Sequence, residues 1–392
     1  MNKPNLKTQD PEVYKILKEE EQRQQEKLCM IPSENFSSKA VREVVGSVFM
    51  NKYSEGYPGE RYYEGSQNVD DLERLAIKRA KEAFNLPEDW SVNVQPHSGS
   101  PANLAVYNAV LNPGDKILSM YLPDGGHLSH GWSYNLNKNN KACSGDELVY
   151  RGGERKVNIV SKIYDVVQYK TNPDTQIFDY DEIEKIALKE KPKLIVTGGT
   201  AYPREIDYKR VSEIAKKVGA IYLSDIAHEA GLIAAGVNKS PVGYADVVTM
   251  TTHKTLRCNR GAMIFSRKEL MIKINKAVFP GLQGGPHNHS IAGIAVGLGE
   301  VMTKEFKDYA KQIVRNAQIL AQELSHYNFK VVSGGTDKHM VLLDLNNKGI
   351  YGRKYARALD YAGIVTNKNT MPGETRTPID PSALRIGTPW IT

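Results

Sequence analysis

A single lysine stands where a buried strand is expected to end. The β-branched run at 247–252 predicts a buried strand, and His253 and Lys254 follow it directly. Burial disfavours the charged form of a lysine, which makes its amine more nucleophilic. Such an amine forms Schiff bases with carbonyl compounds, including the aldehyde of pyridoxal phosphate (PLP). An isolated lysine at a strand end is more often a surface residue, so this interpretation depends on the segments around it.

An acidic residue follows the strand expected just upstream. The run at 220–224 predicts a buried strand, and it ends at Asp225, with His228 three residues further on. In open α/β sheets, ligands bind beyond the carboxyl ends of the strands. A carboxylate there would hold the ring nitrogen of PLP protonated and keep the ring electron-accepting. The pattern therefore predicts that Asp225 and Lys254 share one site.

A third segment has the residue types of a phosphate site. Ser98, Gly99 and Ser100 precede Pro101 and an apolar helical run. Ser100 is the expected N-cap and Pro101 the expected first helical residue, and a helix N-terminus binds phosphate through its free N–H groups. Taken alone, this segment is an ordinary capped turn. An aldehyde anchor, a ring-nitrogen partner and a phosphate site in one chain together favour PLP.

Length, composition and charge narrow the class of protein. A chain of 392 residues is long for one core and suggests two domains, and 40% hydrophobic with 25% charged residues is typical of a soluble globular protein. The net charge of +7 suits anionic ligands such as PLP and folate. Nucleic acid is the alternative, but no arginine-rich arm, RNA-binding aromatic pattern or zinc-ligand spacing supports it.

The cysteines and the N-terminus indicate the compartment. Cys29, Cys143 and Cys258 are scattered, which favours a reducing environment over a disulfide framework. Cys258 is either a redox-sensitive thiol near the site or a buried, inert one. The polar start is no signal peptide and no apolar run could span a bilayer. We predict a cytoplasmic protein without a bound metal.

Helix and strand patterns alternate through the middle of the chain. Helices are expected at 181–190 and 210–218, and strands at 193–197 and 220–224. This alternation predicts a mainly parallel sheet with crossover helices. Two segments are expected to lie outside it. Residues 11–28 form an amphipathic arm, and the polar residues at about 133–159 form a surface insert, either a loop or a hairpin.

Several long motifs, in the same order, resemble the serine hydroxymethyltransferase family. They are Ser33-Glu34-Asn35-Phe36, Asn51-Lys52-Tyr53-Ser54-Glu55-Gly56-Tyr57-Pro58-Gly59, Arg61-Tyr62-Tyr63, Gly125-Gly126-His127-Leu128, Thr251-Thr252-His253-Lys254-Thr255-Leu256, Phe279-Pro280-Gly281-Leu282-Gln283-Gly284-Gly285-Pro286 and Leu384-Arg385-Ile386-Gly387-Thr388-Pro389. The resemblance runs from about Ile31 to the last residue. It implies the α/β PLP-dependent transferase fold type I, with a large domain around a mainly parallel seven-stranded sheet and a smaller α+β C-terminal domain.

The resemblance also implies domain limits. The expected parts are an N-terminal helical arm at 1–30, a large PLP-binding domain at 31–286 and a small C-terminal domain at 287–392. Relatives continue into a further helical tail, so we expect the small domain to lack that tail.

The resemblance assigns roles residue by residue. The implied catalytic residues are Lys254, Glu55, His228, His253, Asp225, Tyr63 and Thr251. The residues implied to bind PLP, with Lys254 as its covalent anchor, are Ser98, Gly99, Ser100, His127, Thr200, Asp225, His228, His253, Lys254, Tyr53, Gly284 and Gly285. Those implied to bind the amino-acid substrate are Ser33, Tyr63, Arg260 and Arg385. Those implied to bind folate are Glu55, Tyr62, Leu122, Gly126, Leu128 and Asn369.

The tyrosine-rich segment at 53–63 holds the expected acid–base residue. An aromatic loop around one carboxyl group can raise its pKa and make it a proton donor near neutral pH. The resemblance makes Glu55 that group and has it meet the folate. It also implies that Tyr53, Tyr63 and the glycine-rich loop at 281–285 act in the site of a neighbouring subunit.

The implied activity is the reversible transfer of the serine one-carbon unit to tetrahydrofolate, giving glycine and 5,10-methylenetetrahydrofolate. The expected assembly is a homodimer or a dimer of dimers with sites at the subunit interface. Two alternatives are a folate-independent threonine or 3-hydroxy-amino-acid aldolase and a basic nucleic-acid-binding protein. The segment that contains Glu55, together with Asn369, favours the folate-dependent transferase.

Overall fold

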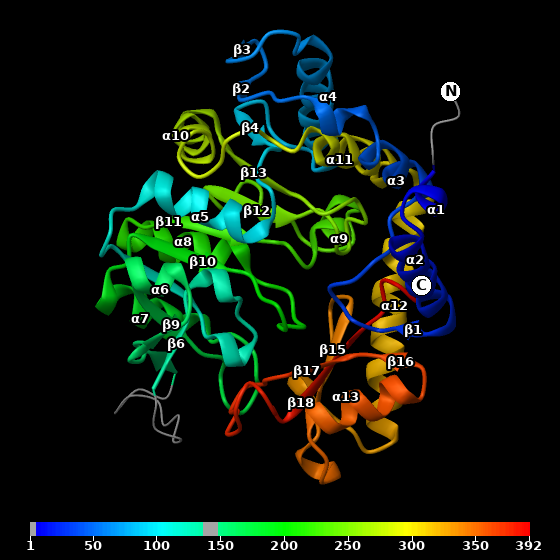
Figure 1. The fold of residues 1–392 in the computed structure, drawn as a ribbon. Coiled ribbons are helices and arrows are strands. Elements are labelled where there is room, and N and C mark those ends of the chain that lie inside the picture. The colour runs from blue at the N-terminus through cyan, green and yellow to red at the C-terminus, as the bar shows by residue number, and fades with distance from the viewer. Residues whose placement is uncertain (1–4, 136–147) are drawn as a thin grey trace.

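The computed structural model, which describes residues 5–135 and 148–392, is organised around one large mixed sheet (Figure 1). Within the described residues this sheet has eight strands, in the order β4, β13, β12, β11, β10, β5, β9, β7. Their bounds are Trp90–Asn93, Ala262–Arg267, Val247–Thr251, Ile221–Asp225, Leu194–Thr197, Lys116–Met120, Asp165–Tyr169 and Val149–Tyr150, respectively. The five strands from β12 to β9 run parallel, whereas β13 and β7 are antiparallel to their neighbours.

Helices cover both faces of this sheet because its strands are apolar on both sides. In β13, Met263 and Phe265 enter one core and Ala262 and Ile264 the other, as the alternation of side chains along a strand requires. The first core is covered by α4 (Gln67–Ala83), α7 (Tyr180–Glu190), α8 (Tyr208–Val218), α9 (Ala230–Ala234) and α11 (Asn288–Val301), and the second by α5 (Gly99–Val110), α6 (Ile159–Ile163) and α10 (Lys268–Val278). This layered α/β architecture confirms the predicted fold class.

The prediction of seven strands is wrong by one, because the eighth strand comes from the segment expected to be a surface insert. Val149 and Tyr150 are buried and pair antiparallel with β9 as strand β7. In the same segment β6 (Ser133–Tyr134) pairs antiparallel with β8 (Arg155–Lys156), as a hairpin would. A two-residue strand is too short to give a periodic signal, so only its tertiary pairing defines it. Cys143 lies outside the described residues.

A smaller antiparallel sheet carries the C-terminal part of the chain. Its strand order is β14, β15, β18, β17, with bounds Lys330–Val331, Met340–Asp344, Ala383–Gly387 and Asn367–Asn369. Helices α12 (Lys304–His326) and α13 (Gly352–Tyr361) pack against it around Val341, Leu343 and Leu384. Helix α11 and the first half of α12 pack on the core of the large sheet, through Leu298 and Phe306 among others. The division at residue 287 stays a prediction.

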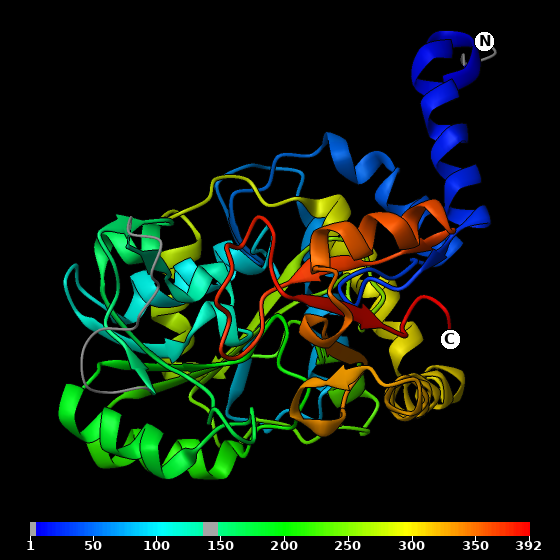
Figure 2. The same ribbon diagram turned by 90° about the horizontal axis from the view of Figure 1, so that it is seen from below.

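Two short strands tie the beginning of the chain to its C-terminal part in a separate two-stranded sheet. Strand β1 (Leu28–Cys29) pairs parallel with β16 (Ile364–Val365), after the arm helix α2 (Pro11–Glu26), which α1 (Leu6–Gln9) precedes. Figure 2 shows α2 projecting from the rest of the molecule. The apolar stripe expected on it is exposed, with Ile16 at 65%. Within the described residues no helix has both the length and the apolar character needed to cross a bilayer.

The strands and helices bring the sequence-predicted site residues to one edge of the large sheet. Asp225 is the last residue of β11, and Lys254 follows the last residue of β12, its parallel neighbour. Helix α5 begins at Gly99 with Ser98 as its N-cap, so the prediction of an N-cap at Ser100 is wrong by two residues. The short helix α3 (Lys39–Val45) packs against α11.

The central strands should dominate the stability of the fold. Leu223 in β11 is fully buried, whereas Ile272 on α10 is 61% exposed. We expect Leu223→Ala to lower the free energy of unfolding by about 2–5 kcal/mol, because it leaves a cavity in the core. Ile272→Ala should change it by less than about 0.5 kcal/mol. Urea unfolding of both variants is the measurement, and equal losses would contradict this account of the core.

Candidate active site

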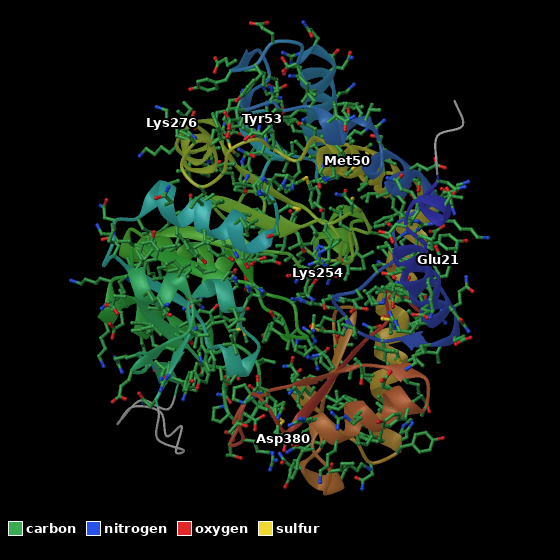
Figure 3. The ribbon with its side chains drawn as sticks, in the orientation of Figure 1. Glu21, Met50, Tyr53, Lys254, Lys276 and Asp380 are labelled. Carbon is green, nitrogen blue, oxygen red and sulfur yellow. The ribbon has the colours of Figure 1, made fainter. Side chains whose placement is uncertain are left out.

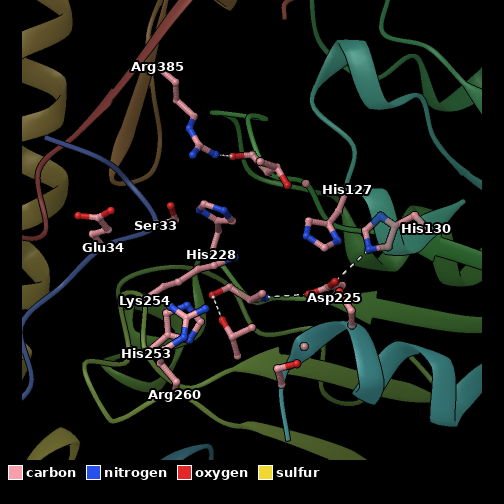
Figure 4. Close-up of a pocket in the computed structure, with 17 residues that line it drawn as sticks. Ser33, Glu34, His127, His130, Asp225, His228, His253, Lys254, Arg260 and Arg385 are labelled. Atoms are coloured by element: carbon pink, nitrogen blue, oxygen red, sulfur yellow. Dashed lines mark hydrogen bonds and ion pairs between the residues drawn. The ribbon is translucent and has the colours of Figure 1, made fainter. Parts of the chain in front are cut away.

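A pocket of about 380 Å³ opens at this edge of the sheet, near the centre of the molecule where Figure 3 labels Lys254. Many of the sequence-predicted site residues line it: Ser33, Ser98, Gly99, Ser100, His127, Thr200, Asp225, His228, Thr251, His253, Lys254, Arg260 and Arg385. In Figure 4, Ser33 and Glu34 lie on one side of the pocket and His127, His130 and Asp225 on the other. Residues distant in sequence therefore converge there, as the sequence analysis predicts.

Lys254 has the properties expected of a nucleophilic lysine. Its side chain is buried at the pocket wall, and its backbone carbonyl accepts a hydrogen bond of 3.2 Å from Asn35. Burial lowers the pKa of Lys254 to about 8; the carboxylate of Asp225 opposes this shift, and the positive charges of Arg385 and Arg260 add to it. A far larger fraction of this amine is therefore neutral near pH 7 than in an ordinary lysine, and the neutral form is the nucleophile.

Asp225 is held as a carboxylate by several donors. Its Oδ2 lies 2.8 Å from Asn103 Nδ2 and 2.9 Å from His130 Nε2, and its Oδ1 accepts a bond of 3.0 Å from the backbone N–H of Ala227. Burial alone would raise the pKa of Asp225, but the hydrogen bond and charge of His130 and the bond from Asn103 hold it far below its usual range. The charged acid can therefore pair with a protonated ring nitrogen.

His130 and Asn103 contact Asp225, and the sequence patterns did not point to either residue. Asn103 lies one helical turn after Gly99 on α5, so that it faces the same edge of the sheet. His130 ends the 3₁₀ turn Leu128–His130, three residues after His127. The one usable signal was this spacing, because buried polar side chains that repeat at helical intervals need a partner.

The start of α5 has the shape of a phosphate cradle. Ser98 occupies the N-cap, and its side chain makes no capping hydrogen bond. A Cβ atom on Gly99 would lie 2.6 Å from Thr251 Cγ2, so that only glycine fits against the end of β12. The open N–H groups of this helix end, with two serine hydroxyls beside them, provide donors for an anion.

Three imidazoles of the pocket, those of His127, His228 and His253, are neutral near neutral pH. Burial lowers the pKa of His127 to about 4 and that of His253 to about 3. The pKa of His228 is well below its usual value because the ring is buried and lies near the positive charges of Lys254 and Arg385. Neutral rings can stack on an aromatic ligand or exchange hydrogen bonds without adding to the positive charge of Lys254, Arg260 and Arg385.

One end of the pocket suits a substrate carboxylate. Arg385 comes from β18 of the small sheet and donates to Asn367 Oδ1 at 3.1 Å and to the carbonyl of Thr200. Burial lowers the pKa of Arg385 to about 10, which still leaves it charged at neutral pH. A buried guanidinium near Ser33 favours bidentate recognition of a carboxylate.

Other predicted residues lie outside this pocket in the single chain: Glu55, Tyr53, Tyr62, Tyr63, Leu122, Gly126, Leu128, Gly284, Gly285 and Asn369. Several of them meet one another instead. The rings of Tyr53 and Tyr63 lie edge to face at 5.2 Å, and a Cβ atom on Gly284 would lie 3.1 Å from Glu55 Oε1. Figure 3 places Tyr53 on a different part of the molecule from Lys254. The roles implied for these residues stay predictions.

Comparison with known proteins decides the family. The family model described as serine hydroxymethyltransferase matches residues 6–392. This chain belongs to the serine hydroxymethyltransferase family. The relatives include serine hydroxymethyltransferases of Acidothermus cellulolyticus, 51% identical over 99% of this chain and 84% of the relative, and of Desulfotalea psychrophila, 50% identical over 99% and 85%. The mitochondrial serine hydroxymethyltransferase of Schizosaccharomyces pombe is 48% identical over 98% of this chain and 78% of the relative.

Membership of the serine hydroxymethyltransferase family confirms the resemblance read from the sequence motifs. This family uses PLP, and the residues of the pocket fit that group. Gly99, where a Cβ atom would clash with Thr251, suits the phosphate of PLP. The charged Asp225 suits its ring nitrogen, and the buried Lys254 suits its aldehyde. Cys258 is buried and its pKa is raised by burial far above its usual range, which favours the inert thiol over the redox-sensitive one.

Replacing the lysine tests the cofactor anchor. We expect Lys254→Ala to abolish covalent attachment of PLP, because no other lysine among the described residues lines the pocket that holds the phosphate cradle. The measurement is reduction with borohydride followed by mass spectrometry of the tryptic peptides. Lys239→Ala, which removes a lysine side chain that is 75% exposed, should retain the modified peptide. A stable, stoichiometric PLP adduct in Lys254→Ala would refute the assignment.

The pKa of Lys254 predicts a pH profile for attachment. Since only the neutral amine reacts, the rate of PLP attachment to the apoprotein should rise about tenfold for each pH unit below about pH 8 and level off above it. An ordinary lysine would continue to gain reactivity up to about pH 10.4. The rate, measured from pH 6 to 10 and divided by that of a lysine-containing peptide, gives the profile. A ratio that does not change with pH would contradict the lowered pKa.

Proposed function

We propose that this protein interconverts serine and glycine, with PLP held by Lys254 and tetrahydrofolate as acceptor of the one-carbon unit. The observation that carries the proposal is the buried Lys254 with lowered pKa in the same pocket as the ionised Asp225 and the Gly99 cradle. Family membership supports the choice among PLP-dependent activities. The direct test is glycine formation from serine in the presence and absence of tetrahydrofolate.

The residues around Lys254 would orient both cofactor and substrate. Ser98, Gly99 and Ser100 would hold the PLP phosphate, and His127 would stack on the ring while His228 lies near its phenolic oxygen. When bound, PLP supplies a protonated ring that accepts electron density from the substrate, a state that Asp225 stabilises. Burial of the pocket excludes water and strengthens these electrostatic interactions.

The substrate would be held through its carboxylate. Arg385 and Ser33 would bind that group, leaving the amino group toward Lys254 and the hydroxymethyl group toward solvent or a second substrate. Because Arg385 is itself fixed by Asn367 and by the carbonyl of Thr200, the carboxylate would be bound in one orientation. Such fixed geometry decides which bond at the substrate Cα breaks.

We propose that the group containing Glu55 completes the site across a subunit interface. In one chain Tyr53, Glu55 and Gly284 lie together but outside the Lys254 pocket. Tyr53, Tyr62 and Tyr63 are 55%, 75% and 45% exposed, which is unusual for aromatic side chains and leaves them accessible to a second copy. In a two-fold dimer, each copy would offer this group to the pocket of the other. Glu55 would then give and take a proton at the serine hydroxyl oxygen.

The cytoplasmic location also remains a proposal. Cys29 and Cys258 are free, and burial raises the pKa of Cys29 to about 12, so neither thiol depends on an oxidising environment. Fractionation of the source cells, with the protein detected by antibody, would test the location.

Replacement of Glu55 separates the folate-dependent reaction from the rest. A carboxyl group can move protons and an amide of the same shape cannot, so Glu55→Gln should lower folate-dependent turnover by about 10²–10⁴. Cleavage of 3-hydroxy amino acids without folate should fall much less, because Lys254, Asp225 and Arg385 remain. Both reactions are assayed in one preparation. Equal losses would contradict a folate-specific role, and a folate-free reaction alone in the unmodified protein would favour the aldolase.

Mixed subunits test the shared site. Co-expressed Lys254→Ala and Glu55→Gln chains each lack one component, and a hybrid dimer has one pocket with both components intact if Glu55 acts across the interface. Random pairing makes half of the dimers hybrids with one working site in two, so we expect about a quarter of the unmodified folate-dependent activity. Activity no higher than the sum of the two separate variants would place Glu55 in the pocket of its own chain.

A further inference from the structure

A second histidine stands behind the pocket histidine His228. His339 Nε2 lies 3.3 Å from His228 Nδ1, and the ring centroids are 5.5 Å apart at an angle of 19°. His339 is fully buried, whereas His228 lines the pocket (Figure 4). Both rings are neutral, because burial lowers both pKa values well below the usual range. A hydrogen bond between two neutral imidazoles needs one N–H and one lone pair, so the state of one ring decides the state of the other.

The segment that carries His339 is docked firmly on the large domain. The backbone N–H of Asp337 donates to the carbonyl of Pro203 at 3.0 Å, and Arg204 pairs with the Asp337 carboxylate at 2.9 Å. On the other side, the backbone N–H of Thr388 donates to the carbonyl of His339 at 3.1 Å. The small sheet therefore presents His339 in a fixed place.

A buried ion pair joins the residues next to these two histidines. Lys338 Nζ lies 2.8 Å from Glu229 Oε2, and the two side chains are only 4% and 5% exposed. Tyr208 donates to the other carboxylate oxygen of Glu229 at 3.3 Å. Ion pairs this deeply buried depend on close geometry, since either charge alone would be strongly destabilising. Lys338 and His339, which are adjacent in one segment, thus contact Glu229 and His228, which are adjacent in the other.

The backbone of His228 is fixed from a third direction. Thr255 Oγ1 donates to the carbonyl of His228 at 2.9 Å and accepts from the backbone N–H of Gly231 at 3.1 Å. With its backbone held, the freedom left to His228 is the rotation of its ring and the choice of the nitrogen that carries hydrogen. His339 contacts the ring at Nδ1, and this contact restricts both the rotation of the ring and the choice of the nitrogen that carries hydrogen.

We propose that His339 is a positioning residue: it fixes the orientation and tautomer of the His228 ring in the pocket, and the Glu229–Lys338 pair holds His339 at that distance. The proposal rests on the proposed function in that His228 is taken to act in the active site. Its consequence is that a buried residue of the small domain decides whether His228 offers a donor or an acceptor to the bound group.

The test reads the His228 ring directly in the protein without PLP. The chain has nine histidines, so ¹³C,¹⁵N-histidine labelling gives few signals, and His228→Gln identifies the signal of His228. In the unmodified protein we expect ring nitrogen shifts of one neutral tautomer between pH 6 and 8. His339→Phe keeps a ring in place but removes both nitrogens, and should move the His228 shifts toward a mixture of tautomers. The same change at His326, whose side chain is 75% exposed, is the matched control.

Activity provides the second readout. His339→Phe should lower kcat of the PLP-loaded enzyme by about tenfold or more, the effect of losing a partner that orients a histidine in other sites. KM for serine should change little, because Arg385 and Ser33 are untouched. His339→Gln retains a polar group and should recover part of the loss. If His339→Phe fails to fold, His339→Gln must still shift the His228 signals.

The ion pair is tested by removing both charges together. Glu229→Gln with Lys338→Met leaves no unpaired buried charge, and should shift the His228 signals in the same direction as His339→Phe but less. Lys330→Met with Asp344→Asn, which removes another pair of the small domain, should leave them unchanged. Unchanged His228 signals in a folded His339→Phe protein would overturn the proposal. Shifted signals in a protein without folate-dependent activity would support it and count against the proposed function instead.

Discussion

The active site depends on the cost of burying opposite charges at the ends of two neighbouring strands. Asp225 and Lys254 share a pocket that is largely closed to water, where each charge loses its hydration. The two groups respond differently. Three donors surround Asp225 and keep it ionised, whereas burial dominates at Lys254 and leaves its pKa at about 8. The pocket therefore contains a strong, fixed negative charge and an amine that loses its proton readily.

Backbone close approach at the same edge of the sheet makes this arrangement possible. A Cβ atom on Gly198, whose φ is +120°, would lie 2.1 Å from the carbonyl oxygen of Asp225, and one on Gly231 would lie 2.1 Å from that of Thr255. The segments after β10, β11 and β12 can therefore pack against one another more tightly than side chains would allow. Asp225 ends β11, and His228 and Lys254 lie in the segments after β11 and β12. Gly198 and Gly231 therefore set the spacing of these groups, although neither glycine lines the pocket.

Short-range sequence patterns predicted those strands, and those residues at strand ends, that short-range interactions determine. The strands β10 and β11 and the positions of Asp225 and Lys254 at or just beyond strand ends follow from runs of apolar and β-branched residues. The two-residue strand β7 and the partners of Asp225 do not, because each is defined by contacts with residues far along the chain. His130 lies outside the apolar and β-branched runs that predict strands, although it makes the bond that keeps Asp225 charged. The residues around Glu55 were predicted from resemblance alone, and one chain cannot place them in the pocket.

The small sheet carries both Arg385, which lines the pocket, and His339, which contacts His228. Arg385 on β18 pairs in register with Leu342 on β15, and His339 directly precedes β15. A movement of this sheet would therefore shift the group that binds the substrate carboxylate together with the ring that contacts His228. Arg385 is also bonded to the carbonyl of Thr200, and Lys338 to Glu229, so this element is held at two places to segments that follow strands of the large sheet. Substrate orientation and the state of His228 thus depend on the same interdomain contacts, and a substitution that loosens either fastening should affect both.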